Sequence, residues 1–408
     1  MQPPERYRLR ALAFTSLAHF LNDSFLVTLS VLVMYYVDMH VPVMFVAAMG
    51  AVVNVLSGLA SPVAASYADR RGLHNALMYA GFLMIAASSA SFAASFVVGG
   101  AARLALIGLG SVLLGLGLST YHPLGGAILQ HAYGAQAGRA LGINGSFGSV
   151  GRAVFPALMV LLIAALGGGP ALALVALYVF VVATVVYVGL RPIRMPASGG
   201  TMAQGAAGLR AYAGALAALT AVVFVRSMFM GGATYYVFKY LDYVTGSKVL
   251  SGVVGAVAYA MAIGGQPLFG WMTTRYGGRA IVYLTTLAST AFYVLFLLVR
   301  SVVLMTAALA LFALFALSGF PVLLGYVNEI VDPSVRAQAN SLVWGIGNTV
   351  GGAVGIIVGG AVWSIGRIGL AGLVATGVES AMWLFALFAV ASSAMLPLLP
   401  RGQRARRT

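Results

Sequence analysis

The residues best suited to chemistry lie in a long apolar stretch near the start of the chain. His19, Asn22 and Asp23 stand at i, i+3 and i+4, so a helix carries all three side chains on one face. At about 1.5 Å per residue, Asp23 lies roughly 18 Å beyond Ala11, near the middle of a bilayer about 30 Å thick. An ionisable group at that depth usually faces a watery cavity or a charged partner and marks a functional site. Asp23 is therefore the predicted centre of the site; the alternative is a packing role in which Asn22 alone satisfies the carboxylate.

The composition is that of a protein that crosses a membrane many times. Of the 408 residues, 61% are hydrophobic and only 8% are charged, which is far from the usage of soluble globular proteins. The apolar runs are about twenty residues long, as membrane-spanning helices require, and lack the short alternating segments of an outer-membrane barrel. The absence of cysteine excludes disulfides and thiolate metal sites. We expect an all-α integral membrane protein with no cofactor and no metal.

Apolar runs between charged or Gly/Pro-rich breaks predict about twelve spans, and an even number places both termini on one side. The excess of Lys and Arg on inward loops identifies that side as the cytoplasm, with sixteen basic residues inside against five outside. This asymmetry explains most of the net charge of +15 without a nucleic-acid partner. We expect a monomer in the lipid bilayer of the cell membrane. The predicted spans are 11–36, 44–66, 76–97, 104–130, 139–165, 170–190, 209–236, 248–271, 280–299, 302–328, 337–362 and 377–399.

The longest break between spans is 191–208, which contains two prolines and a Ser-Gly-Gly run and is typical of a flexible cytoplasmic linker. It divides the chain into an N-terminal half, 1–190, and a C-terminal half, 209–408, each of six spans. The halves repeat three features at an offset of about 200 residues, as transporters with internal duplications do. The matched features are Pro62 and Pro267, Pro123 and Pro321, and Arg139-Ala140 and Arg336-Ala337.

These features resemble the major facilitator superfamily. The signature Gly-x-x-Ala-Asp-Arg-x-Gly follows the second span as Ala65-Ser66-Tyr67-Ala68-Asp69-Arg70-Arg71-Gly72, with alanine for the first glycine. After it, Leu73 and His74 stand where the family prefers basic residues, and in the second half Thr274 replaces the aspartate. Two more stretches resemble the fosmidomycin resistance protein branch in particular. They are His19-Phe20-Leu21-Asn22-Asp23, and His122-Pro123 followed by Gly138-Arg139-Ala140-Leu141, Gly148, Gly151 and Pro156.

The superfamily resemblance implies an inner gate. The aspartate of the signature, here Asp69, is expected to meet a helix N-terminus of the opposite half, a favourable place for negative charge. That helix is the eleventh span, which starts near Arg336. The alternative is a solvated loop charge. The residues assigned to gating are Asp69, Arg70, Gly72, Arg139, Arg275, Arg279 and Arg336.

Besides Asp23, the predicted span interiors hold two charges, Arg152 in the fifth span and Arg226 in the seventh, both at middle depth. Spans three, six, nine and twelve hold no central charge, in agreement with the lipid-facing place of these helices in the superfamily. We expect His19, Asn22, Asp23, Arg152 and Arg226 to face a shared central cavity, because lipid cannot solvate an arginine. Asp23 either pairs with an arginine or accepts a proton when the cavity is dry. The arginines suit an anionic substrate group, and a permanent ion pair is the alternative for Arg152.

Two histidines and several amides and rings complete the candidate site. His19 and His122 are candidate proton relays because imidazole titrates near neutral pH, and a quiet hydrogen bond to a neighbour is the open alternative. The amides are as well explained by hydrogen bonds between helices as by substrate contact, and the aromatic rings by packing. Glycines 142, 145, 148 and 151 make a smooth helix face that favours close packing. The substrate-binding candidates are Asn22, Arg152, Arg226, Asn54, Asn144, Gln266, Tyr235 and Trp344.

The leading interpretation is a secondary active transporter that alternates access around a midplane site. An integral-membrane enzyme acting on lipids needs clustered acids or metal ligands, whereas this chain has eight acidic residues with none closely paired within a span. A channel or receptor is the third possibility, disfavoured by the duplicated halves. The substrate is expected to be a small organic solute, anionic or amphipathic. Efflux by proton antiport, including drug resistance, is what the fosmidomycin-resistance resemblance implies, and proton-coupled uptake of an organic anion fits the charges equally well.

Overall fold

The computed structural model describes residues 4–197, 206–370 and 373–401, so part of the predicted linker, 198–205, lies outside the described residues. Twelve helices in the described part are long and apolar enough to cross a membrane. This confirms the prediction of an all-α integral membrane fold with about twelve transmembrane helices.

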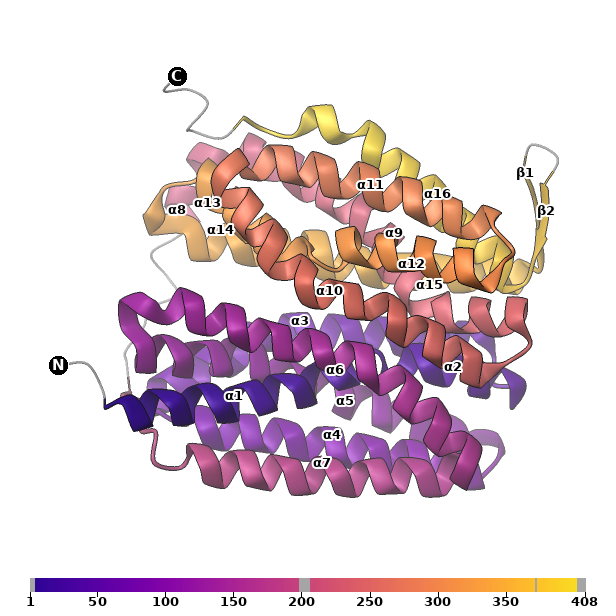
Figure 1. The fold of residues 1–408 in the computed structure, drawn as a ribbon, viewed down its shortest axis with the longest axis horizontal. Helices are drawn as coiled ribbons and strands as arrows, with labels where there is room; N and C mark the ends of the chain where they lie inside the picture. Colours follow the sequence, from indigo (N-terminus) through magenta and orange to yellow (C-terminus); the bar gives the residue numbers. More distant parts are fainter. Residues whose placement is uncertain (1–3, 198–205, 371–372, 402–408) are drawn as a thin grey trace. The chain divides into compact units, whose positions relative to one another are not determined.

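The observed helices mostly match the predicted spans and extend beyond several of them, because the apolar runs mark only the part of a helix that lipid surrounds. The third helix, for example, continues through Arg70 and Arg71. The first span is broken near Leu26 and the tenth near Ser318. The helices are α1 (Glu5–Phe25), α2 (Thr28–Asp38), α3 (Val43–Arg71), α4 (His74–Val97), α5 (Gly100–Tyr133), α6 (Ala137–Leu166), α7 (Gly168–Leu190), α8 (Ala206–Leu209), α9 (Ala213–Thr245), α10 (Lys248–Tyr276), α11 (Gly278–Leu298), α12 (Val302–Ala316), α13 (Gly319–Ile330), α14 (Arg336–Leu342), α15 (Gly351–Ile365) and α16 (Val378–Ala394) (Figure 1).

The chain forms two compact units. The first comprises Met1–Val31 and Val52–Gly200, and the second comprises Leu32–Ala51 and Thr201–Thr408. In the first unit α1 packs against α5 and α6, and α4 packs against α5 and α7. This arrangement brings side chains of α1, α5 and α6 together in the interior of the unit.

The second unit is built around α9, which packs against α15 and α16. A π-helical stretch, Val343–Val350, connects α14 to α15 and also packs on α9. Leu216 and Val223 of α9 contribute to a hydrophobic cluster with residues of α10, α11, α13 and α14. Because lipid tails are as apolar as these side chains, van der Waals packing within the cluster is what stabilises this part of the unit.

The turn between the first two spans belongs to the second unit and is held there by ion pairs. Asp38 lies at the end of α2. Its Oδ1 is 2.8 Å from Lys239 Nζ, and its Oδ2 is 2.5 Å from Lys248 Nζ. Asp242 Oδ2 lies 3.0 Å from Lys239 Nζ and 3.4 Å from Lys248 Nζ. The chain has only these two lysines, so both are committed to this cluster.

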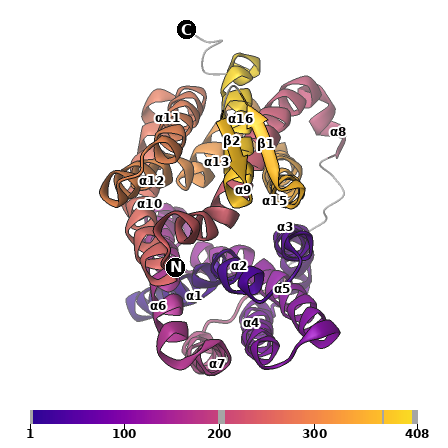
Figure 2. The same cartoon turned by 90° about the vertical axis from the view of Figure 1, so that its right-hand side faces the viewer.

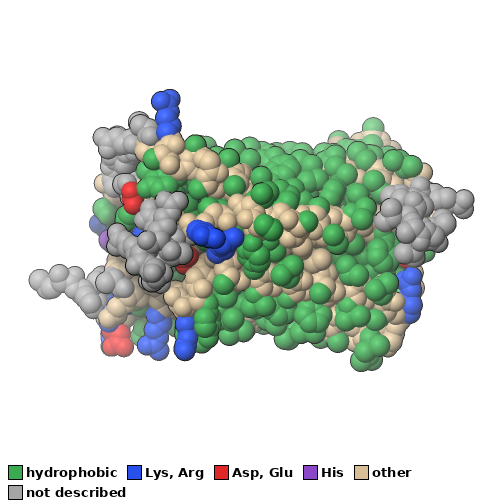
Figure 3. Space-filling model, turned by 90° about the horizontal axis from the view of Figure 1, so that it is seen from above, with side chains coloured by type: hydrophobic (Ala, Val, Ile, Leu, Met, Phe, Trp, Pro, Cys, Tyr) green, Lys and Arg blue, Asp and Glu red, His purple; other side chains and the backbone are tan. Residues whose placement is uncertain are grey.

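A short antiparallel hairpin interrupts the helices. β1 (Arg367–Leu370) pairs with β2 (Leu373–Thr376), with Arg367 opposite Thr376 and Leu370 opposite Leu373. The hairpin connects α15 to α16 (Figure 2). Hydrophobic side chains cover the broad middle of the face in Figure 3, and most of the charged side chains visible there lie toward its two ends, as expected for a surface that lipid surrounds.

Candidate functional site

Asp23 is the centre of a charged cluster inside the first unit, on α1. Its carboxylate is 2% exposed, and His19 of the same helix lies one turn earlier with Nε2 3.4 Å from Oδ2. His122 of α5 approaches from another side, with Nε2 3.4 Å from Oδ1, and Arg152 of α6 places Nε 3.5 Å from Oδ2. Asn22 donates a hydrogen bond of 3.1 Å from Nδ2 to Oδ1. The structure therefore surrounds one buried carboxylate with two imidazoles, a guanidinium and an amide.

A second set of hydrogen bonds fixes the ring of His19. Its Nδ1 lies 2.8 Å from Oδ1 of Asn144, an oxygen that only accepts, so Nδ1 carries a proton. Tyr121 donates to the same Oδ1 at 2.9 Å, and Asn144 donates from Nδ2 to Thr15 Oγ1 at 3.3 Å. Asn144 is thus fully engaged in holding His19 and in joining α6 to α1.

The ring of His19 and the carboxylate of Asp23 face each other through Nε2 and Oδ2. When His19 is neutral, its proton is on Nδ1 and the lone pair of Nε2 faces the carboxylate of Asp23, which is an unfavourable arrangement. A proton on Nε2 turns the same pair into a charge-assisted hydrogen bond. The distance of 3.4 Å between Nε2 and Oδ2 is compatible with a proton between the two side chains, and a role in proton coupling stays a prediction.

A divalent ion suits the cluster less well. His19, Asp23 and His122 offer ligand atoms that lie within 4.8 Å of one another, close enough for a small cation to bridge them. However, the guanidinium of Arg152 already lies beside the same carboxylate, and its positive charge repels a divalent cation at this distance. A proton adds the smallest charge and needs the least space.

Two glycines of α6 make the close approach to α1 possible. A Cβ atom on Gly148 would press on Cδ2 and Nε2 of His19 and would lie 2.8 Å from Oδ2 of Asp23. A Cβ atom on Gly151 would collide with the backbone oxygen of Phe20. Gly142, on the same helix, faces open space. The glycine repeat thus serves close packing at its C-terminal end, directly against the charged cluster.

Arg226 lies in the other unit, on α9. Its side chain is 4% exposed, and its Nε and Nη2 are buried with no hydrogen-bond partner. The neighbouring Ser227 donates instead to Asn348 Oδ1 at 3.1 Å. The structure brings His19, Asn22, Asp23 and Arg152 together. That these residues face a cavity shared with Arg226 stays a prediction.

The other predicted substrate contacts lie on several helices. Asn54 of α3 and Gln266 of α10 are half-buried. Tyr235 is buried and its hydroxyl donates to the backbone oxygen of Val46 at 2.7 Å. Trp344 packs against the hydrophobic cluster of the second unit. These contacts match the packing alternative for both rings, and a role in substrate binding stays a prediction.

Asp69, near the end of α3, has a partner that the sequence did not predict. Its Oδ1 lies 2.8 Å from Nε2 of His74, which is 2% exposed, whereas Asp69 is 48% exposed. The pair sits on either side of Gly72, which has φ +66° and leaves no room for a Cβ beside the backbone oxygen of Met195. Only glycine adopts this backbone readily, so Gly72 sets the tight turn between α3 and α4. The signature thus forms a turn in which the exposed carboxylate of Asp69, near the end of α3, contacts the buried ring of His74.

The equivalent turn of the second half uses a different acid. Gly277, with φ +86°, leads into α11, and the N–H of Gly278 donates to both carboxylate oxygens of Glu329 at 3.0 Å. Glu329 comes from α13 and occupies the positive N-terminal end of α11. Because Thr274 replaces the signature aspartate, the sequence motif gave no sign of this acid.

The predicted gating arginines lie at helix ends. Arg70 and Arg139 are exposed in the first unit. Arg275 stacks on Trp271 at 5.5 Å, and Arg279 stacks on Tyr283 at the same distance. Arg336 donates from Nη2 to the backbone oxygen of Asn328 at 3.2 Å.

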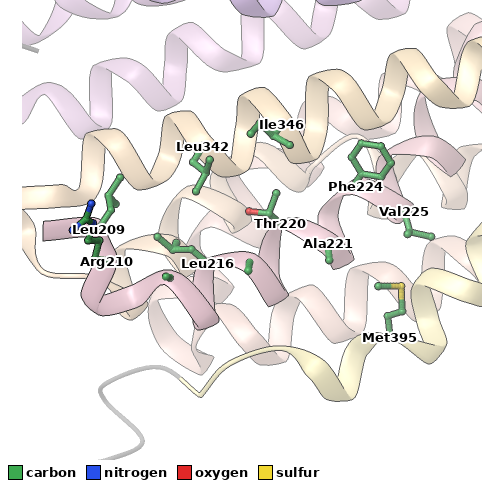
Figure 4. A pocket seen from close by; sticks show the side chains of 12 residues that line it. Leu209, Arg210, Leu216, Thr220, Ala221, Phe224, Val225, Leu342, Ile346 and Met395 are labelled. Atoms are coloured by element: carbon green, nitrogen blue, oxygen red, sulfur yellow. The ribbon is translucent and has the colours of Figure 1, made fainter. Parts of the chain in front are cut away.

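A pocket of about 680 Å³ opens in the second unit along the first half of α9 (Figure 4). Arg210 and Thr220 supply polar groups and the rest of the lining is apolar. The lining residues come from α9 and its N-terminal end, α14, the π-helical stretch and the end of α16, and they do not include Arg226. They are Leu209, Arg210, Ala213, Leu216, Ala217, Thr220, Ala221, Phe224, Val225, Leu342, Ile346 and Met395.

The family model of the Major Facilitator Superfamily matches residues 12–266, more than half of the chain. The chain belongs to this superfamily. Membership supports a multi-pass membrane protein that works as a secondary transporter of a small-molecule substrate. A comparison with curated protein sequences found no match.

Solved structures of superfamily members share the fold. A bacterial homologue of the human lysosomal transporter Spinster is similar over 97% of this chain and 98% of its own in an inward-facing, unoccupied conformation, with a TM-score of 0.74 at 16% identity. The same homologue in an inward-facing, occupied conformation has a TM-score of 0.75 at 17% identity over 99% of both chains. A mutant of the nucleoside transporter NupG has a TM-score of 0.70 at 18% identity over 97% of this chain and all of its own. At sequence identities of 16–18%, this similarity shows that the fold is shared. It does not identify the substrate or the coupling ion of this protein.

Proposed function

We propose that this protein is a proton-coupled secondary transporter that exports a small organic solute, anionic or amphipathic, by antiport. The observation that carries the proposal is the surrounding of Asp23 by His19, His122 and Arg152 on three helices. In this proposal the halves 1–190 and 209–408, joined by the linker 191–208, alternate access to the site. The protein works as a monomer in the cell membrane with both termini in the cytoplasm, and it is not an enzyme.

Exposure suggests the route of the proton. His122 is 51% exposed, His19 is 12% exposed and Asp23 is 2% exposed, so accessibility falls step by step toward the carboxylate. His122 exchanges the proton with the watery side, and the pair of His19 and Asp23 holds it. Arg152 limits how long it stays, because the guanidinium competes with the proton for the same carboxylate.

The direction of transport rests on the resemblance to the fosmidomycin resistance protein branch, which implies efflux and drug resistance. Uptake of an organic anion by proton symport is the second candidate, favoured by the two arginines at middle depth in the spans, Arg152 and Arg226. The substrate contacts in both cases are proposed to come from Asn22, Arg152, Arg226, Asn54, Asn144, Gln266, Tyr235 and Trp344.

Counterflow in proteoliposomes tests the proposal. Purified protein is reconstituted, and radiolabelled organic anions and amphipathic drugs are offered with a pH gradient of either sign. We expect at least one compound to accumulate in the direction opposite to proton flow. Accumulation in the same direction as protons would establish the symport alternative, and exchange that no gradient drives would contradict proton coupling.

We propose a gate made of Asp69, Arg70, Gly72, Arg139, Arg275, Arg279 and Arg336. Asp69→Asn keeps the size of the side chain but removes the charge that faces His74, so the turn after α3 loses its ion pair. We expect slower transport with nearly unchanged substrate binding, because Asp69, near the end of α3, is not among the residues that surround Asp23 on α1, α5 and α6. Transport is measured in liposomes and binding by calorimetry on the same preparations, and a mutant with the full transport rate would return Asp69 to the status of a solvated loop residue.

A further inference from the structure

Arg226 presents an unused hydrogen-bonding edge in the interior of the second unit. The N–H groups of Nε and Nη2 lie along the same edge of the planar guanidinium group. In Arg226 these are the two atoms that are buried without a partner. That edge is the fork with which arginine binds a carboxylate or phosphate through two parallel hydrogen bonds. The side chain is 4% exposed, so water does not solvate the fork in this conformation.

No carboxylate of the chain neutralises Arg226 within its own unit. All eight acidic side chains lie in the described part, and the five that belong to this unit have other partners. Asp38 and Asp242 bind the two lysines, Glu329 binds the N–H of Gly278, Asp332 accepts from Tyr212, and Glu379 binds Arg300.

The two arginines predicted at middle depth in the membrane therefore differ in whether another side chain compensates their charge. Arg152 lies beside Asp23 and donates to Ser149 Oγ at 3.2 Å, so its charge is compensated. Among the described residues of its unit, Arg226 is a buried charge without a counter-ion, an arrangement that destabilises a protein unless an anion completes it. On α9 it lies thirteen residues after Ala213, about 20 Å along the helix, which is near the middle of a bilayer.

We propose that Arg226 is the anchor for the anionic group of the substrate, a carboxylate or another oxyanion of one formal charge, bound by its Nε and Nη2 edge. This assignment rests on the proposed function and narrows it, because it separates the two tasks. The first unit carries the proton on Asp23, and the second unit carries the anion on Arg226. Arg152 then compensates the charge of Asp23, and its proposed contact with the substrate is secondary to that of Arg226.

The packing beside Arg226 fits this role. The guanidinium lies over Gly319 at the start of α13, where a Cβ atom would lie 3.2 Å from Nη1 and 3.5 Å from Nη2. A side chain at this position would fix or displace the guanidinium. Gly319 leaves it free to turn toward an incoming oxyanion.

Calorimetry on the purified full-length protein tests the proposal without knowledge of the natural substrate. The probes are benzoate, inorganic phosphate, chloride and the uncharged benzyl alcohol. We expect benzoate to bind to wild-type protein and to Arg194→Met, which changes an exposed arginine of the first unit, and to bind about tenfold or more weakly to Arg226→Met. Arg226→Lys should recover only part of the affinity, because an ammonium group lacks the fork. Benzoate binding that survives in Arg226→Met or disappears in Arg194→Met would overturn the assignment, as would absence of benzoate binding to wild type.

The inorganic probes separate two sources of the anion. Phosphate that competes with benzoate for Arg226 would still support an oxyanion anchor. Chloride that binds Arg226 while benzoate and phosphate do not would overturn it in favour of a resident inorganic ion.

Thermal unfolding of the ligand-free protein adds a readout that a structural role would not give. Arg226→Met replaces an uncompensated buried charge with an apolar side chain, so we expect its unfolding midpoint to equal or exceed that of wild type. A lower midpoint would show that Arg226 has a structural partner and would overturn the proposal. Gly319→Ala should weaken benzoate binding, and Gly264→Ala, on α10 with open space around it, is the matched control.

These measurements need no proton gradient, so they fail or succeed independently of proton coupling. A protein that binds benzoate through Arg226 and shows no response to a pH gradient would keep the anion site and lose the coupling mechanism. The reverse result would keep coupling and remove Arg226 as the anchor.

Discussion

Asp23→Asn is expected to abolish transport driven by a pH gradient, lowering gradient-driven uptake to the level of protein-free liposomes. Asparagine keeps the shape of the side chain and an oxygen that can accept the hydrogen bond from Asn22, but it cannot take up or release a proton. It also removes the charge that orders His19, His122 and Arg152 around one point. Exchange of substrate without net proton movement is expected to survive, because the anion anchor lies in the other unit.

The measurement is the dependence of uptake on the pH gradient for wild type and mutant side by side. Asp332→Asn is the matched control, since this exposed carboxylate only accepts a hydrogen bond from Tyr212. If Asp23→Asn still concentrates substrate with wild-type dependence on the gradient, coupling lies elsewhere, with His19 and His122 the next candidates.

Gly148→Ala is expected to have the second largest effect, although alanine is the smallest possible addition and carries no charge. Its Cβ presses on His19 Nε2 and lies 2.8 Å from Asp23 Oδ2, so α6 and the cluster cannot both keep their positions. Overpacking of a close interface costs about 1–3 kcal/mol, which corresponds to a factor of about 5 to 160 in the equilibrium that holds the His19–Asp23 pair in place.

Gly142→Ala separates this effect from a general change in helix α6. It adds the same methyl group to the same helix at a place where nothing lies within 4 Å, and alanine favours a helix over glycine. We expect wild-type coupling from Gly142→Ala and weakened coupling from Gly148→Ala, measured as gradient-driven uptake at equal protein in the liposomes. Equal activity of the two variants would mean that the His19–Asp23 geometry does not set the rate.

The membrane fold and the core of the candidate site could be predicted from the sequence because both depend on local patterns. Long apolar runs gave twelve spans, and the spacing of His19 and Asp23 placed them on one helical face. Depth along the span singled out Arg152 and Arg226, since a charge in an apolar run is visible without knowing its neighbours. In the structure, Arg152 lies beside Asp23. Which arginine takes this place depends on helix packing, which the sequence alone does not determine.

The remaining features depend on contacts between distant residues. The bond from Asn144 to His19 joins positions 125 residues apart, and it decides which nitrogen of the ring carries the proton. Glu329 reaches the start of α11 from α13, in a half whose signature lacks the aspartate. His74 was visible only as a departure from the family pattern, and its pairing with Asp69 follows from the turn that Gly72 makes.

The most direct test of the central claim is the release of protons from the purified protein when substrate binds. A compound identified by counterflow is added to wild type and to Asp23→Asn in weakly buffered detergent solution, and the pH change is followed with an indicator dye. The account predicts proton release from wild type on the order of one proton per protein and none from Asp23→Asn, because antiport requires substrate and proton to exclude each other. Equal release from the two proteins, or none from wild type, would contradict the assignment of Asp23 as the coupling site.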